Sequence, residues 1–433
     1  MNINLIVEEF EKTKMFEVRS LMGAIRDHIK QLVIRLLPIY QYLFVKSLRY
    51  KKQINVVFYA CSLAMWRYHH LYEEMAKHPR FKTTIAILPA RGYSKEQRKK
   101  DVETLKEYFI SREIPYVLVE DDVGNCLNLK KEYKPDLVFY PQPYGDLYRE
   151  EHKCNIYMDR LLCYYPYAFW RSIDFWSYNL LFHNIAWKLF YSTELHRKDA
   201  KEIANNKGRN VEVVGYPTAD DFLYRKHVDV WKPQPVKKKR VIWAPHFTIY
   251  PGGLLKQSNF LWMADLMLEI VENYSDEIQF AFKPHPRLYS ELSNSNVWGQ
   301  EKTDEYYRKW ADMDNSQVET GEFIDLFMTS DAMIHDSGSF GVEYHYSGNP
   351  VMYIADDFDE QVSKMSEFGK LAMKQHYVGS NKDDIIRFID DIVLGNNDYM
   401  ATQRKEFVEA YLIPPNGKTV AENTMNVLLK ELC

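Results

Sequence analysis

The sequence predicts an α/β protein with two doubly wound parallel sheets, and three observations support this prediction. Apolar, β-rich segments of strand length alternate with helical segments from residue 54 to residue 356, which is the order that parallel sheets require. The charged segment 227–240 contains two prolines and suits an interdomain linker. With 433 residues, the chain is long enough for two or three domains.

The strands and helices are expected in two successive series of comparable size. Strands are expected at 54–60, 83–90, 115–120 and 135–143, followed by short apolar runs around Ile156 and at 161–165, 186–191 and 211–217. The second series has strands expected at 241–245, 279–286, 317–320, 332–339 and 350–356. Helices are expected at 65–76, 94–111, 257–273, 322–330, from Phe340, and at 382–394, 401–412 and 418–431. Two such domains predict a central cleft, with ligands at the carboxyl ends of the strands.

This pattern divides the chain into five parts. An N-terminal basic amphipathic helical segment (1–53) precedes a first α/β domain (54–226), and the linker (227–240) leads to a second α/β domain (241–400). The last part (401–433) is expected to form helices that pack back across the domains.

Composition narrows the class of protein. Lys and Arg number 56 against 60 for Asp and Glu, a net charge of -4, which argues against a dedicated nucleic-acid-binding protein. None of the five cysteines forms a CxxC pair, so neither a disulfide scaffold nor a structural zinc site is expected. The acidic N-terminus does not resemble an export signal, and the apolar run at 36–45 is too short to span a bilayer. We therefore expect a cytoplasmic protein.

Residues 15–52 read as a basic amphipathic helix with a break or kink at Pro38. From Arg19 to Lys52, eight Lys and Arg residues stand against Asp27 as the only acid. Such a helix can lie on an anionic membrane, which would make the protein peripheral on the cytoplasmic face of the plasma membrane. An ordinary helix packed on the first domain, with a solvated basic face, explains the pattern equally well.

Several familiar catalytic motifs are absent. The sequence has no GxxxxGK[ST], no GxGxxG after a strand, no HExxH and no GxSxG. A P-loop NTPase, a standard dinucleotide-binding fold, a zincin and an α/β-hydrolase are therefore disfavoured.

The strand expected at 332–339 runs into a turn of small residues that opens a helix. Gly338 allows close approach of a ligand, and Ser337 and Ser339 offer hydroxyls beside Asp336. Helix N-termini favour phosphates, and Glu343 is placed to accept from ribose hydroxyls. Taken alone, a Ser/Asp helix cap with a capping glutamate is the commoner explanation.

Two further strand ends carry histidines. Lys283-Pro284-His285-Pro286-Arg287 holds an imidazole between two cations, which suits contact with phosphoryl oxygens or proton transfer. His246 follows the strand expected at 241–245, where a structural histidine is about as common as a ligand contact. Together the three strand ends suit pyrophosphate binding and stabilisation of negative charge during phosphoryl transfer.

At these residues the sequence resembles the CDP-glycerol glycerophosphotransferase family, which makes teichoic acids and related capsule polymers. The resemblance extends from about Val211 to Asp356 through VEVVGYPTAD, VIWAPHFT, FKPHPRL and HDSGSFGVEYHYSGNPVMYI. It implies the GT-B architecture, with two Rossmann-like domains facing a cleft. It also implies an acceptor domain at 54–226 and a nucleotide-donor domain at 241–400.

The resemblance also implies roles for individual residues. Ser337 and Ser339 would bind the donor pyrophosphate beside Gly338, with Asp336 shaping the loop. His285 would contact the transferred phosphoryl group, with Lys283 and Arg287 nearby and His246 at the cleft. In that reading His285, His246 and Asp336 are the catalytic candidates.

One family motif is missing. Family polymerases carry Trp-His-Gly-Thr in the N-terminal domain, where this sequence reads Tyr164 to Trp170 without a histidine. Tyr167 is a candidate acceptor-side residue, although tyrosine is a poor base at neutral pH. His69 and His70, after the first strand, are alternative bases.

These observations predict a transferase that moves a nucleotide-activated alditol phosphate, such as that of CDP-glycerol, to a hydroxyl of a surface polysaccharide or lipid-linked acceptor. The alternatives are a GT-B glycosyltransferase using a nucleotide sugar, a nucleotide-sugar epimerase, and a non-catalytic scaffold of the same fold. The sequence requires no cofactor and indicates no metal site, although it leaves a divalent cation open. No nucleic-acid partner is expected.

Overall fold

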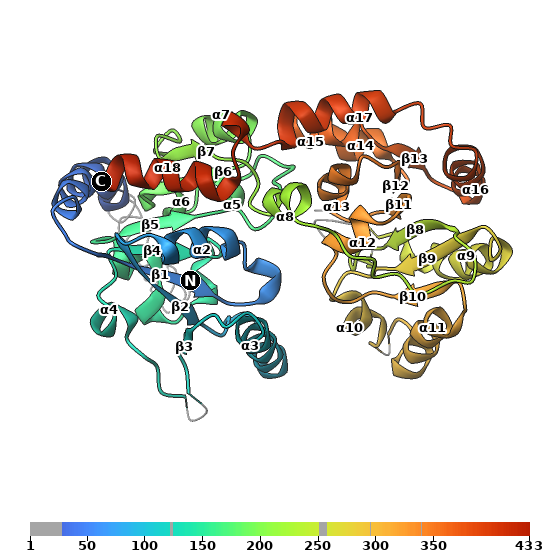
Figure 1. The fold of residues 1–433 in the computed structure, drawn as a ribbon, viewed down its shortest axis with the longest axis horizontal. Coiled ribbons are helices and arrows are strands. Elements are labelled where there is room, and N and C mark those ends of the chain that lie inside the picture. Colours follow the sequence, from blue (N-terminus) through green and yellow to red (C-terminus); the bar gives the residue numbers. More distant parts are fainter. Residues whose placement is uncertain (1–27, 122–123, 251–257, 295, 339) are drawn as a thin grey trace, which may run out of the picture. The chain divides into compact units, whose positions relative to one another are not determined.

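The computed structural model describes residues 28–121, 124–250, 258–294, 296–338 and 340–433. They form two compact units (Figure 1). Unit 1 takes in the described residues up to Tyr167, then Asp174–Val213 and Ala421–Cys433. Unit 2 consists of Ala168–Ile173 and Val214–Val420.

Unit 1 is built on a seven-stranded parallel sheet with the order β3-β2-β1-β4-β5-β6-β7. Its strands are β1 (Ile54–Ala60), β2 (Phe81–Ile87), β3 (Tyr116–Leu118), β4 (Leu137–Tyr140), β5 (Leu161–Tyr164), β6 (Lys188–Tyr191) and β7 (Val211–Val213). Its helices are residues 28–48, α2 (His69–Lys77), α3 (Lys95–Ile110), α4 (Leu129–Glu132), α5 (Phe175–Tyr178), α6 (Leu181–Ile185), α7 (Glu194–Ile203) and α18 (Val420–Leu432). β4, β5 and β6 are buried at every residue, which explains their unbroken apolar runs.

Unit 2 is built on a six-stranded parallel sheet with the order β10-β9-β8-β11-β12-β13. Its strands are β8 (Lys239–Ala244), β9 (Ile278–Phe282), β10 (Ser316–Val318), β11 (Ala332–His335), β12 (Val351–Ile354) and β13 (Tyr377–Gly379). Its helices are α8 (Ala219–Tyr224), α9 (Phe260–Asn273), α10 (Leu288–Leu292), α11 (Gln300–Asp312), α12 (Ile324–Met328), α13 (Phe340–Glu343), α14 (Phe358–Ser363), α15 (Glu367–Met373), α16 (Lys382–Arg387) and α17 (Ala401–Phe407). α16 and α17 continue as π-helical turns, Phe388–Leu394 and Val408–Leu412.

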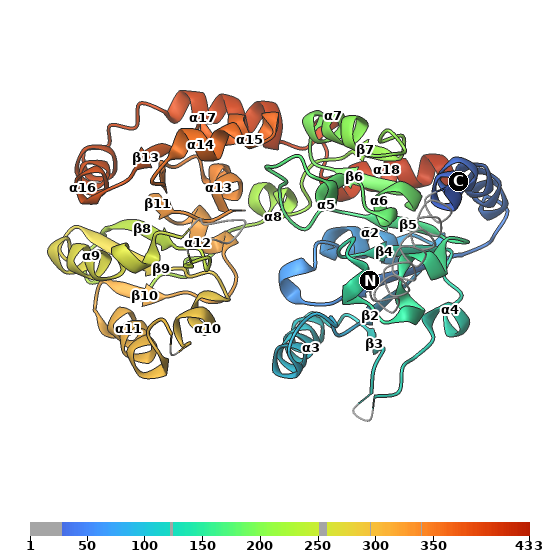
Figure 2. The same cartoon turned by 180° about the vertical axis from the view of Figure 1, so that it is seen from behind.

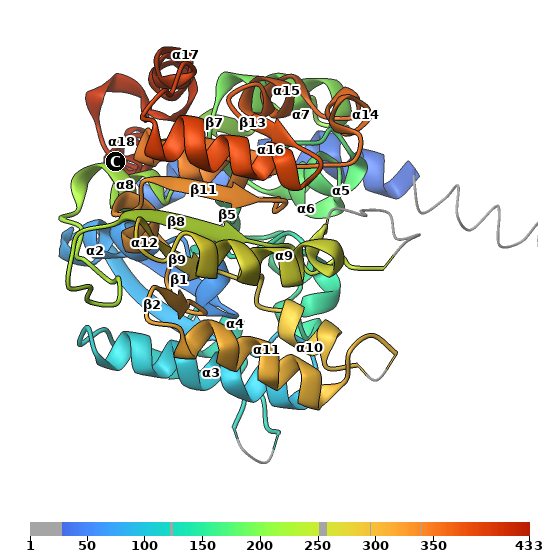
Figure 3. The same cartoon turned by 90° about the vertical axis from the view of Figure 1, so that its right-hand side faces the viewer.

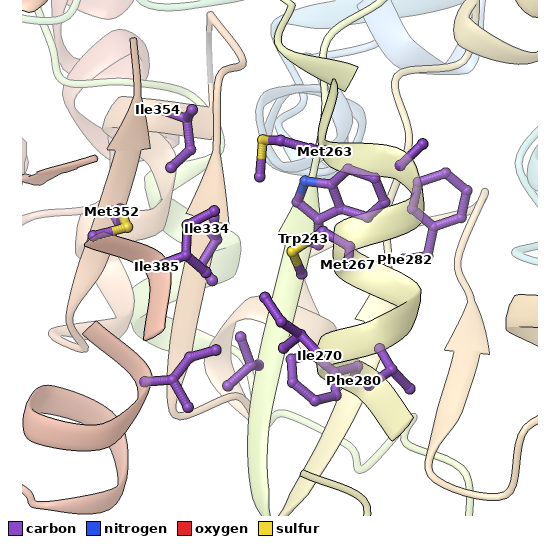
Figure 4. Packing of buried hydrophobic residues seen from close by; sticks show 14 of the residues in the cluster. Trp243, Met263, Met267, Ile270, Phe280, Phe282, Ile334, Met352, Ile354 and Ile385 are labelled. Atoms are coloured by element: carbon purple, nitrogen blue, oxygen red, sulfur yellow. The ribbon is translucent and has the colours of Figure 1, made fainter. Parts of the chain in front are cut away.

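An aromatic and aliphatic core supports the sheet of unit 2. Figure 3 shows α9, α11 and α16 across one face of this sheet, and their apolar side chains join those of the strands in one cluster (Figure 4). Trp243 of β8 lies at its centre, with its ring 5.1 Å from that of Phe282 and 5.5 Å from that of Trp310. This packing makes the central strands of the sheet a rigid base for the segments that follow them.

The C-terminal helix α18 returns to unit 1, where it lies beside β5 and β6 (Figure 2). The hydroxyls of Tyr165 and Thr424 are hydrogen-bonded at 2.5 Å, and Lys188 pairs with Glu431 at 3.4 Å. The segment that follows the helix at 28–48 also contacts α18, because Arg49 donates to the carbonyl of Glu431.

The prediction of two doubly wound parallel sheets is confirmed, but the units divide the chain at a different point from the one expected. The change from unit 1 to unit 2 follows β7, at residues 213–214, whereas the expected linker, 227–240, lies within unit 2. Hydrogen bonds hold it there: Trp231 donates to the Thr329 hydroxyl, and the backbone N–H of Lys232 donates to the side chain of Gln317. The prolines and charged residues of 227–240 therefore belong to an ordered segment of unit 2 and not to a linker between the units.

Two further expectations differ from the structure. The helix runs from residue 28 to residue 48 without a break at Pro38, and the expected residues 15–27 lie outside the described ones. The short edge strand β13 was not expected, because its Tyr-Val-Gly sequence carries no run of apolar residues.

Candidate active site

The three sequence motifs follow three neighbouring strands of unit 2. β9, β8 and β11 are adjacent and parallel, so their carboxyl ends lie at one edge of the sheet. Backbone hydrogen bonds continue past the strands: the N–H of Lys283 donates to the carbonyl of Trp243 at 2.8 Å, and that of His285 to Pro245 at 3.0 Å. The structure thus brings the motifs together, as their positions at strand ends predict.

A buried carboxylate joins these segments. Asp336, which is 2% exposed, follows β11 and accepts the backbone N–H of His246 at 2.6 Å and that of Asn259 at 2.5 Å. Asn259 in turn donates from its side chain to the carbonyl of Ile354. Burial raises the pKa of Asp336 to about 7, while its amide bonds act in the opposite direction. Asp336 therefore fixes the loops after β8 and β11 relative to each other.

The two candidate histidines lie side by side. The ring centroids of His246 and His285 are 5.0 Å apart, and the ring of Phe247 lies 4.4 Å from that of His285. Nδ1 of His285 accepts the N–H of Arg287 at 3.1 Å, and Nδ1 of His246 accepts the N–H of Thr248 at 3.4 Å. Because Nδ1 of His285 is an acceptor, its neutral ring carries the proton on Nε2. We assign the same tautomer to His246, whose Nδ1 also lies 2.9 Å from the Thr248 hydroxyl, a group that can donate to it.

The surroundings keep both rings neutral. Burial lowers the pKa of His246 to about 4, with the charges of Arg171 and Arg287 acting in the same direction. Burial also lowers the pKa of His285 to about 3, helped by His246 and Arg287. At neutral pH both side chains are therefore N–H donors suited to phosphoryl oxygens.

The two cations flanking His285 are already engaged. The ammonium of Lys283 is buried and donates to the carbonyl of Gly321 at 2.6 Å, and burial lowers its pKa to about 8. Arg287 is exposed; it pairs with Glu291 at 2.8 Å and lies over the Phe247 ring at 4.2 Å. Lys283 thus holds the loop after β10, and Arg287 lies at the surface beside the histidines.

The loop after β11 is ordered by its own histidine. Nδ1 of His335 accepts the N–H of Ser337 at 3.1 Å, and both residues are buried. Gly338 follows and is half-buried, whereas Ser339 lies outside the described residues. The expected helix begins at Phe340 but is only four residues long before it tightens into a 3-10 turn, so its dipole is small.

Glu343 lies inside unit 2 rather than at its surface. It is 1% exposed and its Oε1 accepts the hydroxyl of Tyr216 at 2.5 Å. A contact between this carboxylate and a ribose would compete with the Tyr216 bond.

Three buried histidines behind the loop were not singled out from the sequence. The ring of His376 lies 5.2 Å from that of His335 and 4.8 Å from that of His345. Burial lowers the pKa of each ring, that of His376 to about 3. Among the described residues, Nε2 of His335 and Nε2 of His376 have no hydrogen-bond partner. At neutral pH these three rings are therefore uncharged, and they pack together next to the loop.

The acceptor-side candidates belong to unit 1. His69 and His70 begin α2, directly after the segment that follows β1, and Nε2 of His69 lies 3.4 Å from Glu73. Burial raises the pKa of Tyr167, which makes it an even poorer base than a free tyrosine.

One group in the described part of the chain has the composition of a metal site. The ligand atoms of His69, His70 and Glu73 lie within 4.8 Å of one another. Imidazole and carboxylate ligands suit a transition metal such as zinc.

Two residues near the carboxyl edge of the sheet in unit 2, Asn259 and Arg171, were not predicted from the sequence. Asn259 begins α9 and reads as an ordinary helix cap, yet its N–H and side chain link Asp336 to β12. Arg171 is 75 residues before His246 in the sequence, in the segment Ala168–Ile173 that belongs to unit 2. No local pattern could have connected it with strands that begin 68 residues later.

The fold is shared with several solved structures. A variant of the wall teichoic acid polymerase TagF matches with a TM-score of 0.56 and 13% identity, covering 96% of this chain and 98% of that one. The UDP-GlcNAc 2-epimerase of Neisseria meningitidis, bound to UDP-GlcNAc, has a TM-score of 0.55, 14% identity, and coverage of 87% and 100%. The enzyme of Methanocaldococcus jannaschii, in complex with UDP-GlcNAc and UDP, has a TM-score of 0.54, 15% identity, and coverage of 87% and 99%.

The two parallel sheets, shared with these structures, define the GT-B architecture. A family model described as CDP-Glycerol:Poly(glycerophosphate) glycerophosphotransferase matches residues 177–429. The chain belongs to this family, and the resemblance of its motifs to those of the family is confirmed. It is an enzyme of the glycerophosphotransferase type, whose family implies a nucleotide-activated donor and a polymer acceptor. No curated protein sequence matches the chain.

The buried histidines predict loss of stability in acid. The unfolded chain takes up protons near pH 6.5, whereas the folded imidazoles resist protonation because burial lowers their pKa; these are His152, His183, His246, His285, His335, His345 and His376. The free energy of unfolding should therefore decrease as the pH falls from about 6.5 towards 4. Asp336 has the opposite effect, because its raised pKa contributes stability that is complete below pH 3.8 and is lost as the pH rises through about 7. The seven histidines outweigh this single carboxyl group.

Urea denaturation between pH 7.5 and pH 4.5 measures this dependence. The slope should correspond to several protons, and the His376→Gln variant should reduce it by about one proton. A free energy of unfolding that does not change between pH 7 and pH 5 would contradict the account of these side chains.

Proposed function

We propose that the chain transfers a CDP-activated alditol phosphate, glycerol phosphate first and ribitol phosphate next, to a hydroxyl of a cell-surface polysaccharide or of a lipid-linked precursor. The acceptor oxygen attacks the phosphorus that carries the alditol, and the bond from this phosphorus to the bridging oxygen breaks. CMP leaves with that oxygen, and the acceptor proton passes to a base. The observation that carries the proposal is the edge shared by His246, His285 and the Asp336 loop, in a chain of this family.

In this proposal the donor diphosphate binds at the loop Asp336–Gly338, with Ser337 as a phosphate ligand. Nε2–H of His285 and Nε2–H of His246 donate to oxygens of the transferred phosphoryl group, where negative charge develops. Neutral N–H donors fit this role better than proton transfer does, because the pKa of each ring is low. A bound phosphate would raise both values.

The remaining site residues support this arrangement. Asp336 positions the two loops through its amide bonds, and Lys283 holds the neighbouring loop by its bond to Gly321. Arg287 is placed to attract the anionic donor, because it is exposed beside His285. We propose Ser339 as a second phosphate ligand on the sequence motif alone.

The base that accepts the proton is proposed to come from unit 1. His69 is the first candidate, because the carboxylate of Glu73 lies 3.4 Å from its Nε2, where it can stabilise the imidazolium that forms when the ring takes up the acceptor proton. His70 is the second. Tyr167 is better suited to hydrogen bonding with the acceptor, since burial raises its pKa.

Nucleotide preference separates this proposal from a nucleotide-sugar enzyme of the same fold. A thermal-shift series with CMP, CDP, UDP and GDP should show the largest increase in melting temperature with CDP. Incubation with CDP-glycerol should then release CMP, and incubation with UDP-sugars should not release UDP. A chain that binds no nucleotide and releases neither product would be a scaffold.

Substitution at the strand ends should separate binding from turnover. His285→Ala should lower kcat by about a hundredfold to a thousandfold with little change in KM for the donor, because one donor to the developing charge is lost. Ser337→Ala should instead raise KM. Arg387→Ala, which removes an exposed arginine of α16 far along the chain from these loops, is the control. Full activity of purified His285→Ala on the correct donor would show that its assigned role is wrong.

The N-terminal helix supports a second proposal, that the protein binds the cytoplasmic surface of the plasma membrane. One face of the helix at 28–48 packs on unit 1 through buried Ile34, Val45 and Leu48. The opposite face carries five aliphatic side chains that are each more than half exposed: Ile29 (57%), Leu32 (52%), Leu36 (53%), Ile39 (61%) and Leu43 (59%). Within the described residues, none of the helices has the length and hydropathy needed to cross a bilayer.

Charge around this stripe favours an anionic surface. Lys30, Arg35, Lys46 and Arg49 lie on the same helix or directly after it, and each basic residue near such a surface contributes about 1 kcal/mol. One face of the helix packs on unit 1, and the other face presents an apolar stripe with basic side chains on the same helix. The two interpretations of the sequence, a packed helix and a membrane-binding helix, are therefore compatible.

Vesicle binding tests the membrane proposal. The double substitution Leu32→Asp and Leu36→Asp should weaken sedimentation with vesicles of phosphatidylcholine and phosphatidylglycerol by at least about tenfold, because two apolar side chains no longer insert. Ile110→Asp, at an exposed isoleucine of α3, is the matched control. Equal binding of all three proteins, or no binding by the unsubstituted chain, would contradict the proposal.

A further inference from the structure

The short segment Ala168–Ile173 is part of unit 2, although the chain on both sides of it belongs to unit 1. Its backbone is held by α15: the N–H of Ser366, the N-cap residue, donates to the carbonyl of Arg171 at 2.8 Å. The ring of Phe169 lies 4.0 Å from that of Tyr216 and 5.4 Å from that of Phe368. The segment is therefore fixed in unit 2 by a hydrogen bond and by aromatic packing.

Gly369 shows how closely the backbones approach. A Cβ added at this residue would lie 2.4 Å from the carbonyl oxygen of Arg171, which is far inside van der Waals contact. Only glycine permits this approach without moving the segment, so the position of Arg171 depends on Gly369.

The side chain of Arg171 is hydrogen-bonded to a thioether rather than to an anion. Nη1 donates to Sδ of Met373 at 3.1 Å, and a thioether is a weak acceptor. In the described ranges no carboxylate pairs with this guanidinium, which is half-buried. A partly desolvated cation without an anion is unfavourable unless a ligand supplies one.

Contacts lead from this cation to the loop after β11. Met373 packs with Tyr353 in one apolar cluster, the ring of Tyr353 lies 5.3 Å from that of His335, and His335 holds the N–H of Ser337. The charge of Arg171 also lowers the pKa of His335, His376 and His246, in addition to their burial. These contacts connect the guanidinium with the phosphate loop, and its charge acts on the rings around that loop.

We propose that Arg171 binds the donor diphosphate, and specifically the phosphate farther from the nucleoside, which carries the group to be transferred. The inference rests on the proposed function, because it takes the loop Asp336–Gly338 as the diphosphate site. The planar guanidinium can donate two parallel N–H bonds to phosphate oxygens. The loop that Arg171 adjoins is bonded to His246 through Asp336, and His246 and His285 are assigned to the transferred group, so the distal phosphate is the one expected here.

Isothermal titration with CDP and CMP tests the assignment. Arg171→Met keeps the length and the apolar contacts of the stem, and it should weaken CDP binding by about tenfold to a hundredfold, with CMP binding changed by less than about threefold. The preference for CDP over CMP should thus disappear. Arg171→Lys should weaken CDP binding by an intermediate amount, because it keeps the charge and loses the fork.

Two further variants act as controls. Gly369→Ala leaves Arg171 in the sequence but displaces its backbone, so it should also reduce the preference for CDP. Arg387→Ala should leave both affinities unchanged. Melting temperature and circular dichroism of each variant show whether it is folded, and Arg171→Lys replaces Arg171→Met if the latter is not.

The outcomes separate this inference from the function on which it rests. If the unsubstituted chain binds neither CDP nor CMP, the proposed function fails, whether or not it binds UDP or UMP in the parallel titration. If it prefers the diphosphate and folded Arg171→Met keeps that preference, the inference alone is wrong. Equal loss of CDP and CMP affinity would also overturn it, because the contact would then be to the phosphate next to the nucleoside.

Discussion

The candidate site depends on one buried carboxylate. Asp336 accepts backbone N–H groups from the loop after β8 and from the start of α9, so it links segments 77 and 90 residues away in the sequence. Strand order alone brings the ends of β9, β8 and β11 to one edge, but parallel strands leave the following loops free to diverge. The amide bonds to Asp336 remove that freedom, and they place His246 beside both His285 and the Ser337 loop. The serine, glycine and histidine motifs can act as one site because of this connection.

Electrostatically, the site is built from neutral donors and few free cations. Burial keeps the imidazoles of His246 and His285 uncharged near pH 7, and Lys283 is committed to a carbonyl. Neutral N–H groups have a lower desolvation cost than ammonium groups, and they still stabilise charge that develops on phosphoryl oxygens. Positive charge is left to Arg287 at the surface and to Arg171 within unit 2. This division explains how an edge rich in basic residues in the sequence can be largely uncharged in the fold.

Much of this architecture could be predicted from the sequence, for local reasons. Unbroken apolar runs located most of the strands, and residues at strand ends located the site, because parallel strands bring their carboxyl ends together. Interactions made by long-range folding could not be predicted: the bond from Lys283 to Gly321, the burial of Glu343 against Tyr216, and the entry of Ala168–Ile173 into unit 2. The segment 227–240 shows the same limit, since its prolines and charges suit an ordered surface segment as well as a linker.

The most direct measurement is a crystal structure of the full chain with bound CDP. Our account predicts a diphosphate over the loop Asp336–Gly338, with its distal phosphate within hydrogen-bonding distance of Nε2 of His285 and of the Arg171 guanidinium. Electron density for the nucleotide at any other edge of unit 2, or on unit 1, would contradict the assignment of this strand edge as the donor site.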